Sequence, residues 1–517
     1  MSYNPSYCWI LALALGPFFT QRVRDPQRVP KTITQLYSYY IYNILKNHGR
    51  DIENPRDVLL RVGQMAFRGV SQKKIVFTDG DLMKYNLQPS QFLSGFLMEF
   101  LEREDSARSV VYTFPHLTIQ EFVAAVAQFL NPHSGDILKF LTEVHSTTDG
   151  RFEVFLRFVA GLSSPMTARG LEEFLGPFLN ETTCRVIDWV KEEVKRQSGN
   201  TKSEAGKRSL LNTLHYLFES QNRGLAQAAL GSVETLSFNG MTLTPIDCAV
   251  LSHAIGLCDT IKHLDLGSCH IQCEGIQRLG PELHKCQQLR LGRNELGDSG
   301  VKLVSAALRN RECKIHTLWL KYVGLTDSGV EDLVSALSTN PSLTELNLSG
   351  NKLGDSGVKL VSAALRNREC KIQKLWLRDV GLRDSGAEDL ASALSTNPSL
   401  TELDLSENKL GDSGVKLVSA ALRNPECKIQ KLWLRDVGLT DSGAEDLVSA
   451  LSTKPSLTEL YLGYNSLTDR SVPALRRLIL TVPSLKEIQL WGNRFSRTGK
   501  KELRSLQEPR PGLRVIV

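Results

Sequence analysis

Tryptophan recurs at a 57-residue interval in the second half of the chain, at Trp319, Trp376 and Trp433. Each lies in the middle of Leu-Trp-Leu, and arginine follows two residues later at Arg378 and Arg435. Tryptophan, tyrosine and arginine are the side chains enriched in the energetic centres of protein interfaces. The chemistry that this spacing indicates is therefore non-covalent recognition of another macromolecule.

Patterns typical of catalysis are missing from the sequence. No His/Cys/Asp cluster has the spacing of a zinc site, and no G-x-S-x-G nucleophile turn occurs. The segment nearest to a phosphate-binding loop is 201–208 (TKSEAGKR), which lacks the first glycine and the final hydroxyl of G-x-x-x-x-G-K-[ST]. We therefore expect a chain that is not an enzyme and that holds no metal or cofactor of its own.

The elements that position the tryptophans are internal repeats. Residues 343–399 return as residues 400–456 with 51 identical positions and six differences. Each block divides into two units of 28 and 29 residues with the line L-x-x-L-x-L-x-x-(N or V)-x-L, which is typical of a leucine-rich repeat. About ten units of 25–29 residues follow one another from Val233 to the C-terminus. The predicted fold class is an α/β leucine-rich-repeat solenoid, a horseshoe with strands lining its inside.

Within each predicted strand the flanking leucines point inward, so the residue between them points outward. These outward positions form the candidate binding face, together with Arg378 and Arg435 one alternation further on. They are Ser237, Asp265, Arg290, Trp319, Asn347, Trp376, Asp404, Trp433, Tyr461 and Gln489. The alternative is that Leu-Trp-Leu is only the repeat consensus, copied by duplication. The differences between the two blocks include Asn347 against Asp404 and Gly350 against Glu407, whereas the leucines do not vary.

The first half of the chain has helical periodicity. We predict helices over 32–46, 55–67 and 117–130, with short strands at 75–77 and 110–114. This order favours a winged-helix unit at 51–128, followed by a second helical domain at 129–232. Residues 196–209 (RQSGNTKSEAGKRS) carry no strongly apolar side chain and are the candidate linker. The apolar run 8–19 (CWILALALGPFF) has no preceding Lys or Arg, which favours a buried helix over the core of a secretory signal.

Composition limits the class of protein. The net charge of +6 is spread over both halves with no basic block, which argues against a nucleic-acid partner. The ten cysteines show no disulfide framework, and this indicates a cytoplasmic protein. No segment is a candidate for spanning a membrane.

Several segments resemble a known family. The alternating 28- and 29-residue units, with LWLRDVGLRDSG in one and LDLSENKLGDSG in the next, resemble ribonuclease inhibitor and the C-terminal repeats of the NLR family of cytosolic immune receptors. Residues 112–124 (YTFPHLTIQEFVA) look like the winged-helix signature of that family. Residues 4–10 (NPSYCWI) look like the segment that closes its nucleotide pocket, so that 1–50 would be the end of a NACHT module. The subgroup that fits best is the vertebrate NLRC type.

The resemblance implies roles for two residues. By position, His116 would contact the β-phosphate of a bound nucleotide and Pro5 would lie near its adenine. The other nucleotide-binding parts of the family would lie upstream, so ADP or ATP is expected only if that core is present.

We therefore expect an innate immune receptor or regulator. The inner face of its solenoid would bind a protein ligand or hold the receptor shut, through a contact with a NACHT module. The alternative is a ribonuclease-inhibitor-like binder of a basic enzyme. A third possibility is an ATPase switch, if the upstream core is restored.

Overall fold

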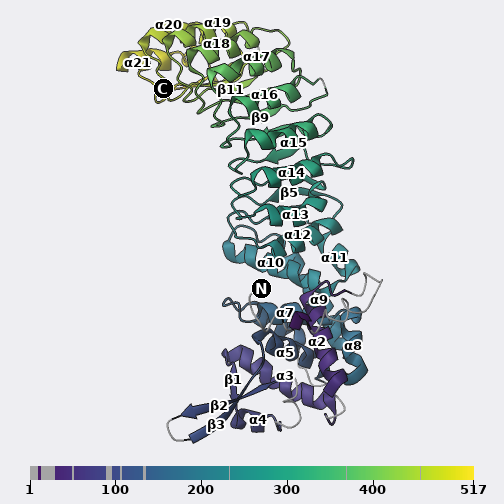
Figure 1. Ribbon diagram of the computed structural model, residues 1–517. Coiled ribbons are helices and arrows are strands. Elements are labelled where there is room, and N and C mark those ends of the chain that lie inside the picture. Colours follow the sequence, from purple (N-terminus) through teal and green to yellow (C-terminus); the bar gives the residue numbers. More distant parts are fainter. Residues whose placement is uncertain are drawn as a thin grey trace. The chain divides into compact units, whose positions relative to one another are not determined.

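The computed structural model describes residues 8, 10–12, 29–48, 52–88, 96–104, 107–131, 136–231, 233–367, 369–454 and 456–517, with the backbone alone at 99–104 and 107–109. Pro5 and most of the apolar run 8–19 lie outside these residues. The chain forms two compact units, 1–232 and 233–517 (Figure 1). The second unit begins at Val233, where the sequence predicts the first repeat.

The first unit starts with helices around a small sheet. The elements in order are α2 (Ile33–His48), α3 (Pro55–Gln72), β1 (Val76–Thr78), α4 (Asp79–Lys84), β2 (Met98–Glu104), β3 (Ala107–Thr113) and α5 (Leu117–Leu130). The strands pair antiparallel in the order β1-β3-β2. Gly63 lets α3 approach α5, because a Cβ there would lie 2.4 Å from the Cβ of Ala127. Helices followed by this sheet confirm the predicted winged-helix unit.

Six helices complete the first unit. They are α6 (Ile137–His145), α7 (Glu153–Leu162), α8 (Pro165–Leu175), α9 (Asn180–Gln197), α10 (Glu204–Ser220) and α11 (Arg223–Leu230). The predicted linker over 196–209 is wrong, because only residues 198–203 separate α9 from α10. The Ser203 hydroxyl caps α10 by accepting from the Gly206 amide at 3.1 Å, and Gly206 is buried. Residues 204–209 lack the apolar side chains by which a helix is recognised in a sequence. The start of α10 depends instead on the Ser203 cap and on the close packing of Gly206.

The second unit alternates strands with helices. Its elements are β4 (Thr235–Ser237), α12 (Pro245–Leu257), β5 (Ile261–Asp265), α13 (Cys273–Leu283), β6 (Cys286–Arg290), α14 (Gly297–Leu308), β7 (Thr317–Trp319), α15 (Asp327–Leu337), β8 (Glu345–Asn347), α16 (Gly354–Leu365), β9 (Lys374–Trp376), η3 (Asp384–Gly386), α17 (Ala387–Thr396), β10 (Glu402–Asp404), α18 (Gly411–Leu422), β11 (Lys431–Trp433), α19 (Asp441–Leu451), β12 (Glu459–Tyr461), η4 (Asp469–Ser471), α20 (Val472–Thr481), β13 (Glu487–Gln489), α21 (Arg497–Ser505) and β14 (Arg514–Ile516).

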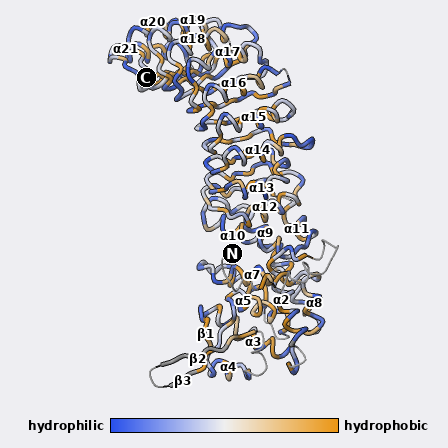
Figure 2. The backbone as a smooth tube through the Cα atoms, viewed as in Figure 1, coloured by the Kyte–Doolittle hydropathy of each residue, from blue (hydrophilic) through white to orange (hydrophobic). Residues whose placement is uncertain are grey.

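The strands form one 11-stranded parallel sheet in chain order, with β4 and β14 at its edges. The helices stack beside one another in the same order (Figure 1). Hydrophobic and hydrophilic stretches alternate along the chain in each repeat (Figure 2). The leucines on either side of each central strand residue are buried, for example Leu346 and Leu348. This architecture is the predicted leucine-rich-repeat solenoid.

Buried asparagines hold the repeats together. The Asn351 Oδ1 atom accepts from the amides of Val323 and Leu325, both at 3.1 Å, and its Nδ2 atom donates to the Leu320 and Leu348 carbonyls. Asn294, Asn408 and Asn465 repeat this pattern two units apart. Asn351 therefore satisfies backbone groups of its own unit and of the preceding unit at the strand exit.

Asp355, in the first turn of α16, forms hydrogen bonds with the next unit. Its carboxylate accepts from the Arg383 amide at 2.8 Å and from the Ser385 hydroxyl at 2.5 Å, both in the next unit. Asp298, Asp412 and Asp441 reach across to the following unit in the same way. The aspartates therefore join neighbouring units instead of closing their own helices.

No helix among the described residues is both long and apolar enough to pass through a bilayer.

Candidate functional site

The outward strand residues form one continuous row across the parallel sheet. Asp265 is aligned with Arg290, Arg290 with Trp319, and the alignment continues strand by strand to Tyr461 and Gln489. The leucines on either side are buried against the helices, so these side chains point away from the helices. We call the ten aligned residues from Ser237 to Gln489 the central row, and the sheet surface that bears them the inner face. All ten are partly exposed.

A first aromatic and cationic cluster lies on strands β6 to β9. The Arg290 guanidinium stands 4.3 Å from the centre of the Trp319 ring, and the Lys321 amine stands 5.6 Å from it. The Trp319 ring is 6.3 Å from that of Trp376, two strands away across Asn347. The sequence placed Arg290, Trp319 and Trp376 on this face, and the structure brings them together.

A second cluster lies on strands β11 to β13. The rings of Trp433 and Tyr461 stack at 5.0 Å with an angle of 10° between their planes. The Arg435 guanidinium lies 4.4 Å from the Tyr464 ring and 5.0 Å from the Trp491 ring. Tyr464 and Trp491 were absent from the predicted site. Trp491 could have been found, because it follows Gln489 at the spacing by which Arg435 follows Trp433.

The polar members of the central row have a structural role. Asp265, Asn347 and Asp404 each accept a hydrogen bond from the backbone amide two residues later, at 3.0, 3.0 and 2.9 Å. Burial raises the pKa of Asp404, although bonds from Ser406 and the nearby Arg378 oppose this effect. The exchange of Asn347 for Asp404 between the two blocks therefore keeps the strand-exit bond and changes the charge beside Trp376.

Charged residues one alternation before the central row pair with one another. Lys374 lies 2.7 Å from Glu345, and Lys431 lies 3.6 Å from Glu402 and 3.2 Å from Glu459. Arg514 continues the pattern with Glu487 at 3.0 Å. Such exposed pairs contribute about 0–1 kcal/mol each. Their main effect here is that these carboxylates already have cationic partners.

The difference between Gly350 and Glu407 follows from packing at the strand exit. A Cβ at Gly350 would lie 2.1 Å from the Tyr322 ring, so a side chain at 350 requires a smaller residue at 322. In the other block Glu407 follows Asp379 in place of tyrosine, and Arg378 binds Glu407 at 2.6 Å. Variation at these positions is therefore coupled between adjacent units, which weakens its value as a sign of changing partners.

His116 is the N-cap of α5. The Thr118 amide donates to its Nδ1 atom at 3.2 Å, which places the neutral ring's proton on Nε2, and the Thr118 hydroxyl is 2.7 Å from Nδ1. Burial lowers the pKa of His116, which favours this neutral form. The histidine thus has a structural task at the helix start. Its contact with a nucleotide phosphate stays a prediction, as does that of Pro5, which lies outside the described residues.

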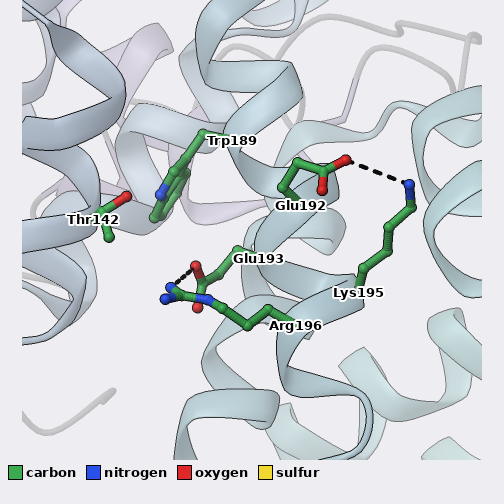
Figure 3. Close-up of a pocket in the computed structure, with 6 residues that line it drawn as sticks. All are labelled: Thr142, Trp189, Glu192, Glu193, Lys195 and Arg196. Atoms are coloured by element: carbon green, nitrogen blue, oxygen red, sulfur yellow. Dashed lines mark hydrogen bonds and ion pairs between the residues drawn. The ribbon is translucent and has the colours of Figure 1, made fainter.

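The first unit holds a surface hollow of about 440 Å³ that the sequence did not indicate (Figure 3). Thr142, Trp189, Glu192, Glu193, Lys195 and Arg196 line it. Its charges pair internally, since Lys195 lies 3.4 Å from Glu192 and Arg196 bonds to Glu193 (Figure 3). These pairs leave it without a free charged group, and we do not count it as a binding site.

Glu193, which lines this hollow, also joins three helices. Its carboxylate lies 2.9 Å from Nε2 of His145 on α6, which also contacts the Ser209 hydroxyl on α10 at 2.9 Å. Burial alone would raise the pKa of Glu193, but hydrogen bonds from His145, Gln197 and Arg196 outweigh it and lower the pKa to about 2. The cluster stabilises the packing of α6, α9 and α10. Among the residues described above, no group of three His, Cys, Asp or Glu side chains could hold a metal ion.

Comparison with known proteins gives three matches to family models. Residues 57–114 match the NOD2 winged helix domain, residues 116–228 match NLRC4 helical domain HD2, and residues 258–280, 339–362 and 396–419 match the leucine-rich repeat. The match to HD2 begins at His116, so α5 falls in the second helical domain and not in the winged-helix domain predicted to end at 128.

Curated relatives match most of this chain. "NACHT, LRR and PYD domains-containing protein 3" is 29% identical in Rattus norvegicus over 526 residues and 30% identical in Bos taurus over 523 residues; each match covers 90% of this chain and 50% of the relative. Protein 12 of the same series from Homo sapiens is 29% identical over 509 residues, covering 90% of this chain and 47% of the relative. The chain thus spans about half the length of the curated relatives that it matches.

A solved internalin from Listeria monocytogenes is similar over 62% of this chain and 96% of its own, with 16% identity and a TM-score of 0.33. The named relatives contain PYD domains, whereas two family models are named for NLRC4 and NOD2, so the NLRC subgroup stays a prediction. The winged helix, the HD2 helices and the repeats follow one another as the resemblance implied, and the chain is related to proteins of the NLR family.

Proposed function

We propose that this chain acts as an interaction protein of innate immunity and that the inner face of its solenoid is the surface that contacts a protein partner. The observation that supports this proposal best is the central row itself. It places three tryptophans, a tyrosine and their neighbouring arginines in register on one exposed strip, grouped in two clusters. Partly exposed aromatic rings with arginine beside them are the side chains from which interface hot spots are built.

The partner is either another macromolecule or a NACHT module of the same receptor. The family relationship supports the setting, because the relatives are named for NACHT and leucine-rich-repeat domains. We propose that the chain performs no catalysis and needs no cofactor for this contact. We further propose that it acts in the cytoplasm and that ADP or ATP concerns only a receptor that includes the nucleotide-binding core.

A ribonuclease-inhibitor-like binder of a basic enzyme is less well supported. Such a partner would need free carboxylates on the inner face. Glu345, Glu402, Glu459 and Glu487 instead pair with Lys or Arg on adjacent strands.

The experiment compares two double variants of the full chain. Trp376→Ala/Trp433→Ala removes one ring from each cluster, whereas Lys359→Ala/Lys416→Ala changes exposed side chains on helices α16 and α18, on the other side of the sheet. Affinity-purified partners are quantified by mass spectrometry, and circular dichroism checks the fold. We expect the tryptophan variant to lose the partners that the lysine variant retains. Retention by a folded tryptophan variant would contradict the proposal.

A further inference from the structure

A hollow of about 240 Å³ lies at the strand-exit end of the first four repeats, on the inner face. Strands β5, β6 and β7 each contribute a member of the central row to it, namely Asp265, Arg290 and Trp319. The remaining lining residues come from the turns that follow the strands. They are Asn239, Gly267, Ser268, Gly292, Arg293 and Lys321.

Glycine makes room for this hollow. A Cβ at Gly292 would lie 2.6 Å from Cγ of Lys321, and a Cβ at Gly267 would lie 2.7 Å from Nδ2 of Asn239. The stem of Lys321 therefore lies directly over the backbone of the preceding unit. Long side chains form the walls and two glycines form the floor.

The charge of the hollow is mainly positive. It contains three cations, Arg290, Arg293 and Lys321, and one carboxylate, Asp265. Asp265 is already engaged, since its Oδ1 atom accepts from Asn239 at 3.1 Å and from the Gly267 amide at 3.0 Å. Its Oδ2 atom is 3.9 Å from Arg290.

Two of the cations are not paired with a carboxylate among the described residues. In the part of the chain that the structure describes, neither Arg293 nor Lys321 forms an ion pair. Arg378 follows Trp376 at the same spacing as Lys321 follows Trp319, but it binds Glu407 at 2.6 Å. The first cluster on the inner face thus retains positive charge that Glu407 neutralises at Arg378. Arg435, at the same position after Trp433, lies against the rings of Tyr464 and Trp491 instead.

Arg290 is held in place before any partner arrives. Its guanidinium lies 4.3 Å from the Trp319 ring, and such stacking fixes the planar group and favours binding of a carboxylate. A positioned arginine loses less conformational entropy on binding than a free one.

We propose that this hollow receives a carboxylate side chain from an acidic segment of a protein partner, between Arg290, Arg293 and Lys321. The volume supports a side chain, because pockets for whole small molecules measure roughly 300–1,000 Å³. Opposite charge across an interface gives specificity and faster association. The proposal rests on the proposed function of the inner face and adds the chemistry of the partner, which is acidic and not a basic enzyme.

The test uses fluorescence anisotropy with the full chain and three labelled peptides of equal length. In these, glycine alternates with glutamate, glutamine or phosphoserine. The hollow variants are Lys321→Glu and Arg293→Glu. Lys302→Glu is the control, because it makes the same charge change on helix α14, where the side chain is 68% exposed.

We expect the glutamate peptide to bind in low salt, the glutamine peptide not to bind, and each hollow variant to weaken binding about tenfold while Lys302→Glu changes it less than twofold. Absence of binding, or equal weakening in all three variants, would overturn the proposal. Binding of the phosphoserine peptide alone would also overturn it and would assign the hollow to phosphate.

The two sets of variants distinguish failure of the acidic-segment proposal from failure of the inner face as the partner-binding surface. A natural partner that is lost in Trp376→Ala/Trp433→Ala but retained in Lys321→Glu and Arg293→Glu would refute the acidic hollow and leave the inner face as the binding surface. A glutamate peptide that binds through the hollow, with no partner lost in the tryptophan variant, would refute the wider proposal alone.

Discussion

Replacing Asn351 by alanine removes the side-chain amide that connects two adjacent units of the solenoid. In the native chain its Oδ1 atom accepts from Val323 and Leu325 at 3.1 Å, and its Nδ2 atom donates to Leu320 at 2.8 Å and Leu348 at 2.7 Å. Asn351 is 3% exposed, so little water reaches these groups. The substitution leaves two amides and two carbonyls without a partner.

A buried polar group that loses its partner costs about 1–3 kcal/mol. The summed cost of four such groups is an upper limit, because local relaxation and entry of water restore part of the lost hydrogen bonding. We therefore expect the free energy of unfolding to fall by about 3–5 kcal/mol. Asn367→Ala is the matched control in the same unit. Its side chain accepts from the Glu369 amide at 3.0 Å and donates to the Ser338 carbonyl at 3.5 Å, both at exposed sites, so about 1 kcal/mol or less is expected.

Urea unfolding followed by circular dichroism gives the loss in stability, with the transition of the repeats analysed separately from that of the helical unit. Hydrogen exchange adds a local measurement, since the amides of Val323 and Leu325 should lose protection in Asn351→Ala alone. Equal stability of the two variants, with both amides still protected, would refute this account of how the repeats are held together.

Three further predictions concern coupling, pH and a helix cap. Gly350→Glu should lower the free energy of unfolding by about 2 kcal/mol, because the Tyr322 ring occupies the space that the new side chain needs. Adding Tyr322→Asp should recover more than half of that loss. Additive effects of the two substitutions in a double-mutant cycle would contradict the coupling. The pKa of Glu193 is lowered from 4.5 to about 2, so its ionised form contributes stability that is present above about pH 4.5 and is lost as the pH falls toward 2. Over that range the native chain should lose up to about 3 kcal/mol more than the Glu193→Gln variant. Parallel curves of unfolding free energy against pH for the two proteins would contradict this prediction. His116→Ala should cost about 1 kcal/mol through loss of the α5 cap, whereas His116→Asn should retain most of it; equal melting temperatures for the two would show that the cap is unimportant.

The repeat architecture could be predicted from the sequence because, in a solenoid, the spacing of the leucines along the chain also determines which side chains pack in the core. A leucine at every second strand position determines both the buried layer and the outward row, so the register of Trp319, Asn347 and Trp376 followed directly. The linker at 196–209 was mispredicted for a local reason. Composition alone cannot show that Ser203 caps a helix and that Gly206 packs closely.

The partners of each inner-face side chain could not be predicted, because they depend on distances across strands. Nothing in the spacing showed that Arg378 would pair with Glu407 while Lys321 would not pair with a carboxylate. Nor did it show that Tyr322 and Gly350 vary together. Such pairings arise between units about 28 residues apart and depend on which rotamer each long side chain adopts.

The most direct test of the inner face as the contact surface is photo-crosslinking in cells. A benzoylphenylalanine replaces Asn347 or Gln489, which lie on the central row and leave the tryptophans intact, or replaces Lys359 or Lys416 on the helices. We predict that both central-row positions yield the same partner adducts, that Trp376→Ala/Trp433→Ala abolishes them, and that the helix positions yield none. Adducts that form only at the helix positions, or that persist in the tryptophan variant, would contradict the account.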